Sequence, residues 1–192
     1  MHDIWIPLNT VAHGGQEFII DDVAVWTTPL TEFGLPYRIA KPLQGNIFLL
    51  PQEDGCLVRG KLTGSLVVSC DRCAEDATIE INHSFDSYEA FPMNASDGNP
   101  SEVFGDTTDE EAFADADEAI RLAPEGKGFE IGLSALLWEE LLLALPFKPL
   151  CKQDCKGLCP SCGKNLNDGP CQCTKEEGDP RMAVLRGLKL QK

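Results

Sequence analysis

The sequence predicts an α+β protein, in which a small antiparallel β-sheet or open barrel packs against one helix and carries a cysteine-rich C-terminal module. Three observations predict this class. Short apolar stretches separated by turn residues fill the first half of the chain, a helical apolar pattern follows, and cysteines crowd residues 151–173. The length of 192 residues suits one domain of ordinary size with a small appendage.

Residues 1–91 are expected to form an antiparallel β domain, because their apolar residues come in short runs bounded by turn residues. The stretches with strand-like patterns are residues 18–25, 47–50, 57–69 and 77–90. The link between the last two stretches reads SCDRCAED. Cys70 and Cys73 therefore lie at the end of a predicted β-hairpin.

Three further segments follow the β domain. Residues 92–128 are expected to be an acidic flexible insertion, because residues 97–118 carry nine acidic and no basic side chains. Residues 129–149 predict a core-packing helix with a proline-rich exit, because leucines recur there at three- and four-residue spacing before two prolines. Residues 150–192 hold the cysteine-rich module and, from Pro180, a predicted short basic helix.

Charge is distributed unevenly along the chain. The formal net charge is −15, of which residues 1–145 contribute −19 and residues 146–192 contribute +4. An acidic body repels nucleic acid over a Debye length of about 8 Å, so RNA contact would have to use the C-terminal quarter. The N-terminus has no secretory-signal pattern and no apolar run is long enough to span a membrane, which favours the cytoplasm.

The cysteines are expected to bind metal rather than to form disulfides. There are nine, an odd number, and the expected compartment is reducing. Cys56 stands apart and is expected to be a small buried apolar residue. The other eight form four close pairs, in chain order Cys70 and Cys73, Cys151 and Cys155, Cys159 and Cys162, and Cys171 and Cys173.

Four thiolates fill one tetrahedral zinc ion, so eight can serve two ions. The preferred grouping joins the third pair to the fourth, as a zinc-ribbon-like module, and the first pair to the second, which fastens the tail to the hairpin. A rival grouping uses Cys155, Cys159, Cys162 and one of Cys171 or Cys173, and leaves the hairpin pair to bind alone or stay free. The sequence therefore predicts one or two structural zinc ions and leaves the grouping open.

Other cysteine chemistries fit the pattern less well. Catalytic zinc keeps an open position and usually has His or carboxylate ligands, whereas His2, His13 and His83 all lie outside the cysteine clusters. A thioredoxin-like pair opens a helix after a strand, whereas Cys70 and Cys73 lie between two predicted strands. The CPSCG turn favours zinc over an iron–sulfur cluster, and no cysteine run has ferredoxin spacing.

The motifs VSCDRC, LLLALP, CKGLCPSCGKNLN and DPRMAVLRGL occur in this order along the chain. This composite resembles the YceD family, also called the large ribosomal RNA subunit accumulation protein family. Cys70, Arg72 and Cys73 match the family's C-x-R-C hairpin, residues 141–149 match its LLLALP-x-x-P segment, and residues 155–167 match its CKGLCPxCGxNLN tail.

The resemblance implies a non-enzymatic, cytoplasmic ribosome-synthesis factor that supports accumulation of large-subunit (23S) ribosomal RNA. Because the chain is acidic, we expect it to act mainly through protein contacts, with a basic ribosomal protein or a large-subunit assembly intermediate as partner and no membrane. Any rRNA contact would use the basic final helix and the lysines around the cysteines, Lys148, Lys152, Lys156 and Lys164. Two alternatives stay open: a thiol redox or redox-chaperone protein, and a general zinc-ribbon interaction module.

Overall fold

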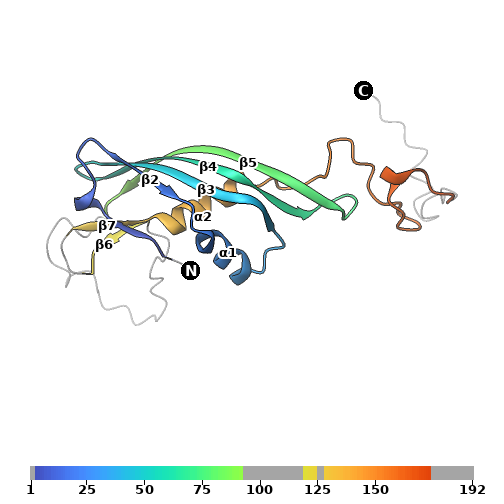
Figure 1. Cartoon of the computed structure of the whole chain (residues 1–192), viewed down its shortest axis with the longest axis horizontal. Helices are drawn as coiled ribbons and strands as arrows, with labels where there is room; N and C mark the ends of the chain where they lie inside the picture. Colours follow the sequence, from blue (N-terminus) through green and yellow to red (C-terminus); the bar gives the residue numbers. More distant parts are fainter. Residues whose placement is uncertain (1–2, 93–118, 125–127, 174–192) are drawn as a thin grey trace, which may run out of the picture.

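The computed structural model describes residues 3–92, 119–124 and 128–173, which form a β-rich body and a C-terminal tail (Figure 1). The elements in chain order are β1 (Trp5–Pro7), η1 (Leu8–Thr10), β2 (Gln16–Ile20), α1 (Val23–Glu32), β3 (Arg38–Pro51), β4 (Gly55–Ser69), β5 (Asp76–Ala90), β6 (Ile120–Leu122), β7 (Phe129–Gly132), α2 (Leu133–Ala144) and η3 (Leu166–Asp168). Within these residues, no helix is long and apolar enough to cross a membrane.

Two antiparallel sheets make up the body. The larger sheet has the strand order β2-β3-β4-β5, and the smaller has the order β1-β7-β6. The expected antiparallel β structure and the packed helix are therefore both present. Figure 1 shows both helices on the same side of the long β3–β5 strands, which bend over them.

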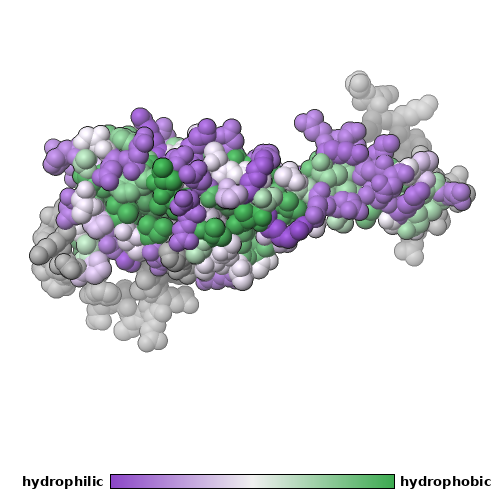
Figure 2. Space-filling model, viewed as in Figure 1, coloured by the Kyte–Doolittle hydropathy of each residue, from purple (hydrophilic) through white to green (hydrophobic). Residues whose placement is uncertain are grey.

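The core lies between the larger sheet and α2. Alternate residues of β4, among them Val58, Leu62 and Leu66, are fully buried on the face that the helix covers. Leu137 and Leu141 of α2 are buried in the same cluster. Apolar side chains also lie on the surface of the body, as Figure 2 shows, whereas hydrophilic side chains are prominent over the tail.

Residues 1–91 were expected to be all β, but they also contain helix α1. Its sequence, VAVWTTPLTE, is rich in β-branched residues and reads locally as a strand. The Asp22 side chain accepts the Ala24 N–H at 2.9 Å and caps the first turn. Val25, Trp26 and Leu30 are then buried at helical spacing, and this packing outweighs the weak local preference.

Two short strands are further differences. The segment predicted as a helix from residue 129 begins instead as β7, which pairs with β1 and β6, and α2 starts only at Leu133. Strand β6 lies inside the predicted acidic insertion and pairs Ile120 with Ile131. The pairing of β7 with β1 is long-range, so the sequence pattern carried no signal for it, whereas β6 and β7 follow one another in the chain and form a hairpin. Residues 93–118 of the insertion and the predicted helix from Pro180 lie outside the described residues.

A glycine in β4 makes room for an aromatic ring of the neighbouring strand, and this contact can be tested. Gly60 lies opposite Phe85 of β5, and a Cβ at Gly60 would overlap the Phe85 ring. We expect Gly60→Ala to lower the free energy of unfolding by about 1–3 kcal/mol, because an overpacked core must shift. Chemical denaturation gives the value. Gly14→Ala is the control, because nothing lies within 4 Å of its Cβ position; equal midpoints for the two variants would contradict the prediction.

Candidate metal centres

The turn between β4 and β5 presents two cysteines at the far end of the larger sheet. The Cys70 N–H donates to the Glu75 carbonyl at 2.7 Å, and the Ala74 N–H donates to the Cys70 carbonyl at 2.9 Å. Ala74 has a φ of 61°, a left-handed conformation that non-glycine residues rarely adopt. This turn orients the thiols of Cys70 and Cys73 to the same side.

Backbone hydrogen bonds fasten the tail to this turn. The Asp71 N–H donates to the Pro149 carbonyl at 2.9 Å, and the Leu158 N–H donates to the Arg72 carbonyl at 3.0 Å. The Arg72 side chain donates from Nη1 to the Cys155 carbonyl at 2.9 Å. The tail therefore runs past the hairpin and brings a second pair of cysteines against the first.

We call Cys70, Cys73, Cys151 and Cys155 the inner site. Their Sγ atoms all lie within 4.8 Å of one another. The Cys70 and Cys155 sulfurs are 3.8 Å apart, and the Cys73 and Cys151 sulfurs are 3.6 Å apart. Four sulfurs at about 2.3 Å from one tetrahedral ion are about 3.8 Å from each other, so this spacing suits zinc. Three of the four residues are buried and Cys151 is half-buried.

We call Cys159, Cys162, Cys171 and Cys173 the outer site. Their Sγ atoms also lie within 4.8 Å of one another, and those of Cys159 and Cys171 are 3.4 Å apart. The Gly163 N–H closes the turn onto the Cys159 carbonyl at 2.9 Å, and Gly163 has a φ of 72°. Cys162 and Cys173 are exposed, so this site is more open to solvent than the inner one.

The structure thus brings together the eight cysteines singled out from the sequence, in the grouping that was preferred there. The rival grouping does not describe this geometry, because Cys155 joins the hairpin pair rather than Cys159 and Cys162. Whether these thiols ligate a metal stays a prediction. Each group offers four sulfurs and no carboxylate or imidazole, a set that fits a closed structural zinc site better than a catalytic one.

Each group contains at least one thiol whose pKa is lowered. Burial opposes ionisation of Cys70, but backbone N–H groups at Cys151, Arg72 and Cys73 outweigh it and lower the pKa of Cys70 to about 6. The backbone N–H groups of Cys162 and Ser161 lower the pKa of Cys159 to about 6. A metal ligand must be a thiolate, so these two sulfurs are prepared for a first bond to an ion.

Cys151 and Cys173 resist ionisation while their neighbours carry the charge. Burial, followed by hydrogen bonding to neighbouring thiols, raises the pKa of Cys151 to about 12. Hydrogen bonding to Cys162, with burial second, raises the pKa of Cys173 to about 12. Only a bound cation could hold four thiolates together at this spacing, and binding it would release protons.

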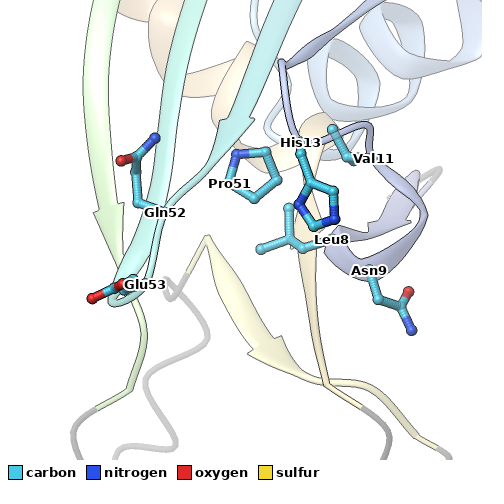
Figure 3. A pocket seen from close by; sticks show the side chains of 7 residues that line it. All are labelled: Leu8, Asn9, Val11, His13, Pro51, Gln52 and Glu53. Carbon is cyan, nitrogen blue, oxygen red and sulfur yellow. The ribbon is translucent and has the colours of Figure 1, made fainter.

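The ninth cysteine and the two histidines that the structure describes, His13 and His83, are not members of these groups, and His2 lies outside the described residues. Cys56 is fully buried, as expected, and burial raises its pKa to about 11. The His83 imidazole lies 2.8 Å from a Glu140 carboxylate oxygen, between β5 and α2. His13 lines a cavity of about 550 Å³ between the η1 segment and the β3–β4 turn (Figure 3). This cavity lies at the opposite end of β4 from the inner site, and its lining includes no cysteine, serine or lysine.

Two asparagines belong to the site that sequence reasoning did not single out. The Asn167 amide donates from Nδ2 to the Cys155 Sγ at 3.3 Å, and Asn165 caps the short η3 helix by accepting the Asn167 N–H at 3.0 Å. Both asparagines belong to the sequence NLN, and the only feature that drew attention to it was its match to a family motif. Residues that contact a metal ligand but do not bind the metal follow no fixed spacing in the sequence, so a spacing rule could not have found them.

These features define the class: an antiparallel β protein with two four-cysteine groups in a tail held at one sheet end. The model of the family described as "Large ribosomal RNA subunit accumulation protein YceD" matches residues 58–189. Because this match covers more than half of the chain, the protein belongs to the YceD family.

Comparison with curated proteins gives relatives of two kinds. An uncharacterized protein of Mycobacterium tuberculosis is 33% identical over 133 residues, which cover 69% of this chain and 55% of the relative. A chloroplastic protein of Arabidopsis thaliana, named large ribosomal RNA subunit accumulation protein YCED homolog 1, is 25% identical over 165 residues, which cover 81% of this chain and 51% of the relative. The chain thus spans about half the length of these relatives. No solved structure matches it.

The contact between the tail and the hairpin can be tested at Gly157. Its φ of 73° disfavours any side chain, and a Cβ there would lie 2.9 Å from the Arg72 carbonyl oxygen. We expect Gly157→Ala to cost about 1–2 kcal/mol for the backbone strain alone and more for the clash. Hydrogen exchange of the Leu158 amide, which donates to the same carbonyl, should become faster.

Gly163→Ala separates the two effects of that substitution. Gly163 has nearly the same φ, 72°, but nothing lies within 4 Å of its Cβ position. Gly163→Ala should therefore introduce the backbone strain without the clash, and it should accelerate hydrogen exchange of the Leu158 amide less than Gly157→Ala does. Equal acceleration in both variants would mean that the tail does not rest on the Arg72 carbonyl.

Proposed function

We propose that the protein is a non-enzymatic factor of ribosome synthesis that supports accumulation of large-subunit ribosomal RNA, and that two structural zinc ions hold its tail in place. The family match carries the first half of the proposal. The name of the chloroplastic relative agrees with it. The family is named for the accumulation of an RNA and not for a reaction, which favours a binding role. We expect this role in the cytoplasm.

The grouping of the cysteines supports the zinc half of the proposal. Two sets of four sulfurs, each set within 4.8 Å of one another and with no other ligand type, suit an ion that prefers thiolates and four-fold coordination. A closed set of four leaves no open position for substrate. Zinc would therefore act on the fold of the tail and not on a reacting molecule.

Zinc binding also changes the charge of the tail. A zinc ion with four thiolates has a formal charge of about −2, so the two sites together would contribute about −4, from six cysteines of the tail and two of the hairpin, beside the +4 of residues 146–192. The whole chain, already at −15, would become more acidic by about 4 charges. Such a protein gains little from contact with phosphates, so a basic protein of the large subunit or its assembly intermediate is the better partner.

An exposed apolar segment supports protein contact as well. Where α2 leads into the tail, Leu143 is 68% exposed and Phe147 is 95% exposed. Large apolar side chains so far out in solvent suit the burial that a protein interface provides. Lys148 is next to Phe147 in the sequence. If the described tail contacts rRNA, the contact uses its four lysines, Lys148, Lys152, Lys156 and Lys164.

A thiol redox or redox-chaperone role is the second candidate, because a pKa of about 6 at Cys70 and Cys159 is what a reactive thiol requires. Cys70 is buried, however, and backbone N–H donors of the same kind also serve metal thiolates. A general zinc-ribbon interaction module is the third candidate. The two experiments below separate all three.

Metal content tests the zinc proposal directly. We expect elemental analysis of the purified chain to find two zinc ions per molecule. Cys70→Ser should leave one ion, because it breaks the inner site, and Cys159→Ser should also leave one, because it breaks the outer site. Cys56→Ala is the control and should keep both ions, because Cys56 lies outside both groups. A zinc-free wild type that reduces disulfides would favour the redox candidate.

Deletion of the gene tests the ribosomal role. We expect the protein to co-sediment with large-subunit precursors, and cells without it to accumulate less mature large-subunit rRNA while small-subunit rRNA is unchanged. The Cys70→Ser and Cys56→Ala variants, expressed in the deletion strain, compare a damaged metal site with an intact one. A normal rRNA ratio in the deletion strain, with a partner outside the ribosome, would support the interaction-module candidate instead.

A further inference from the structure

The Asn167 side chain connects the two cysteine groups. Its Nδ2 donates to the Sγ of Cys155, an inner-site cysteine, at 3.3 Å and to the Asn165 Oδ1 at 2.9 Å. Its Oδ1 accepts the Lys156 backbone N–H at 2.9 Å. Asn167 itself belongs to the segment between Cys162 and Cys171, which are outer-site cysteines. One side chain thus reaches from the loop of one site to a sulfur of the other.

The orientation of the Asn167 amide follows from its partners. A backbone N–H can only donate, so the group that faces Lys156 must be the Asn167 oxygen. The nitrogen then points to the Cys155 sulfur, where it acts as a donor. The arrangement therefore favours a thiolate at Cys155, the form that binds a metal.

The outer-site loop holds Asn167 at this position. The Leu166 N–H donates to the Gly157 carbonyl at 2.9 Å, and Leu158 forms an isolated antiparallel bridge with Asn165. The Lys164 Nζ donates to the Pro170 carbonyl at 3.1 Å across the loop. The loop has one short 3₁₀ turn and no buried apolar residue, so its closure depends on the cysteines at its two ends.

We propose that Asn167 is a positioning residue that couples the two metal sites. Metal at the outer site closes the loop and holds the Asn167 amide against Cys155, so the inner site binds its ion more tightly when the outer site is filled. By thermodynamic linkage, metal at the inner site tightens the outer site by the same factor. This inference rests on the proposed zinc binding. Outer-shell partners of metal ligands typically change affinity by about 10–100-fold, which sets the expected size of the effect.

Zinc affinities of the full-length chain test the coupling. Competition with a chromophoric chelator measures the two ions in the wild type and in Asn167→Ala. We expect the product of the two affinities to be about tenfold lower in Asn167→Ala, because the ion that binds second no longer gains from the first. Asp168→Asn is the control, because this neighbouring side chain is exposed, and it should leave both affinities unchanged.

Asn167→Asp keeps the shape of the side chain and an oxygen for the Lys156 N–H. It replaces the donor that faces Cys155 by an acceptor. It should therefore weaken the inner ion more than Asn167→Ala does. An inner affinity in Asn167→Asp equal to that of the wild type would overturn the proposal.

Single-site backgrounds separate coupling from a local effect. In Cys162→Ser, where the outer site is broken, the inner ion should already bind about tenfold more weakly, and Asn167→Ala should add less than about twofold. In Cys70→Ser, where only the outer site remains, Asn167→Ala should change nothing.

Three results would overturn the coupling. The first is a full tenfold effect of Asn167→Ala in the Cys162→Ser background, which would make the hydrogen bond independent of the outer site. The second is weaker outer binding in the Cys70→Ser background, which would make Asn167 a support of its own loop. The third is a wild-type chain that binds fewer than two ions. That result would also refute the zinc proposal, and it is seen before any change at residue 167.

Discussion

The meeting of the β4–β5 hairpin thiols with those of the tail is the contact on which the rest of the structure depends. The tail has one short 3₁₀ helix and an isolated bridge, and its described residues add little to the main core. The second buried cluster consists of Cys70, Cys73, Ala77 and Cys155, with Leu150 and Cys151 against it, so it is built mainly of sulfur. Such a cluster buries too little apolar surface to order a segment of this length by itself. Free energy of metal binding is then available as folding free energy, as in other small cysteine-rich modules.

The body of the protein offers little positive charge to a phosphate backbone. Arg38, Lys41 and Arg59 each form an ion pair across the sheet, with Asp76, Glu80 and Asp86 of β5. These pairs are exposed and add little to stability, but they neutralise cations on the outer face of the sheet. Arg121 pairs with Glu130, and its guanidinium carbon lies 3.6 Å from the centre of the Trp5 ring. The remaining lysines of the described chain are concentrated in the tail, next to sites whose thiolates would offset them. A partner that brings its own positive charge therefore suits the whole surface, and this favours a basic protein over bare RNA.

The sequence predicted those features that depend on short-range patterns. Alternation in residues 57–69 and 77–90 gave the hairpin, and the spacing of cysteines gave the four pairs. The contact between Cys70 and Cys155, separated by 85 positions, belonged to the preferred of two groupings, because four sulfurs fill one ion, but the sequence left the rival grouping open. Features that depend on tertiary packing were not predictable in this way. Helix α1 has strand-like residues and forms because Trp26 is buried, and β7 interrupts a helical pattern because β1 and β6 pair with it. Asn167 has no pattern of its own, since its role exists only once the loop has folded over Cys155.

The two sites differ in exposure, and this difference gives the proposed coupling a direction. Cys162 and Cys173 of the outer site face solvent, whereas Cys70, Cys73 and Cys155 of the inner site are buried. A chelator or an oxidant therefore reaches the outer ion first. Without coupling, its loss would free only a surface loop and leave the tail docked on the hairpin. With the Asn167 amide withdrawn from Cys155, the inner ion is held less tightly too, and the docking of the tail weakens with it. Under the proposed coupling, loss of the outer ion would therefore loosen the docking of the whole tail, although the two sites share no ligand.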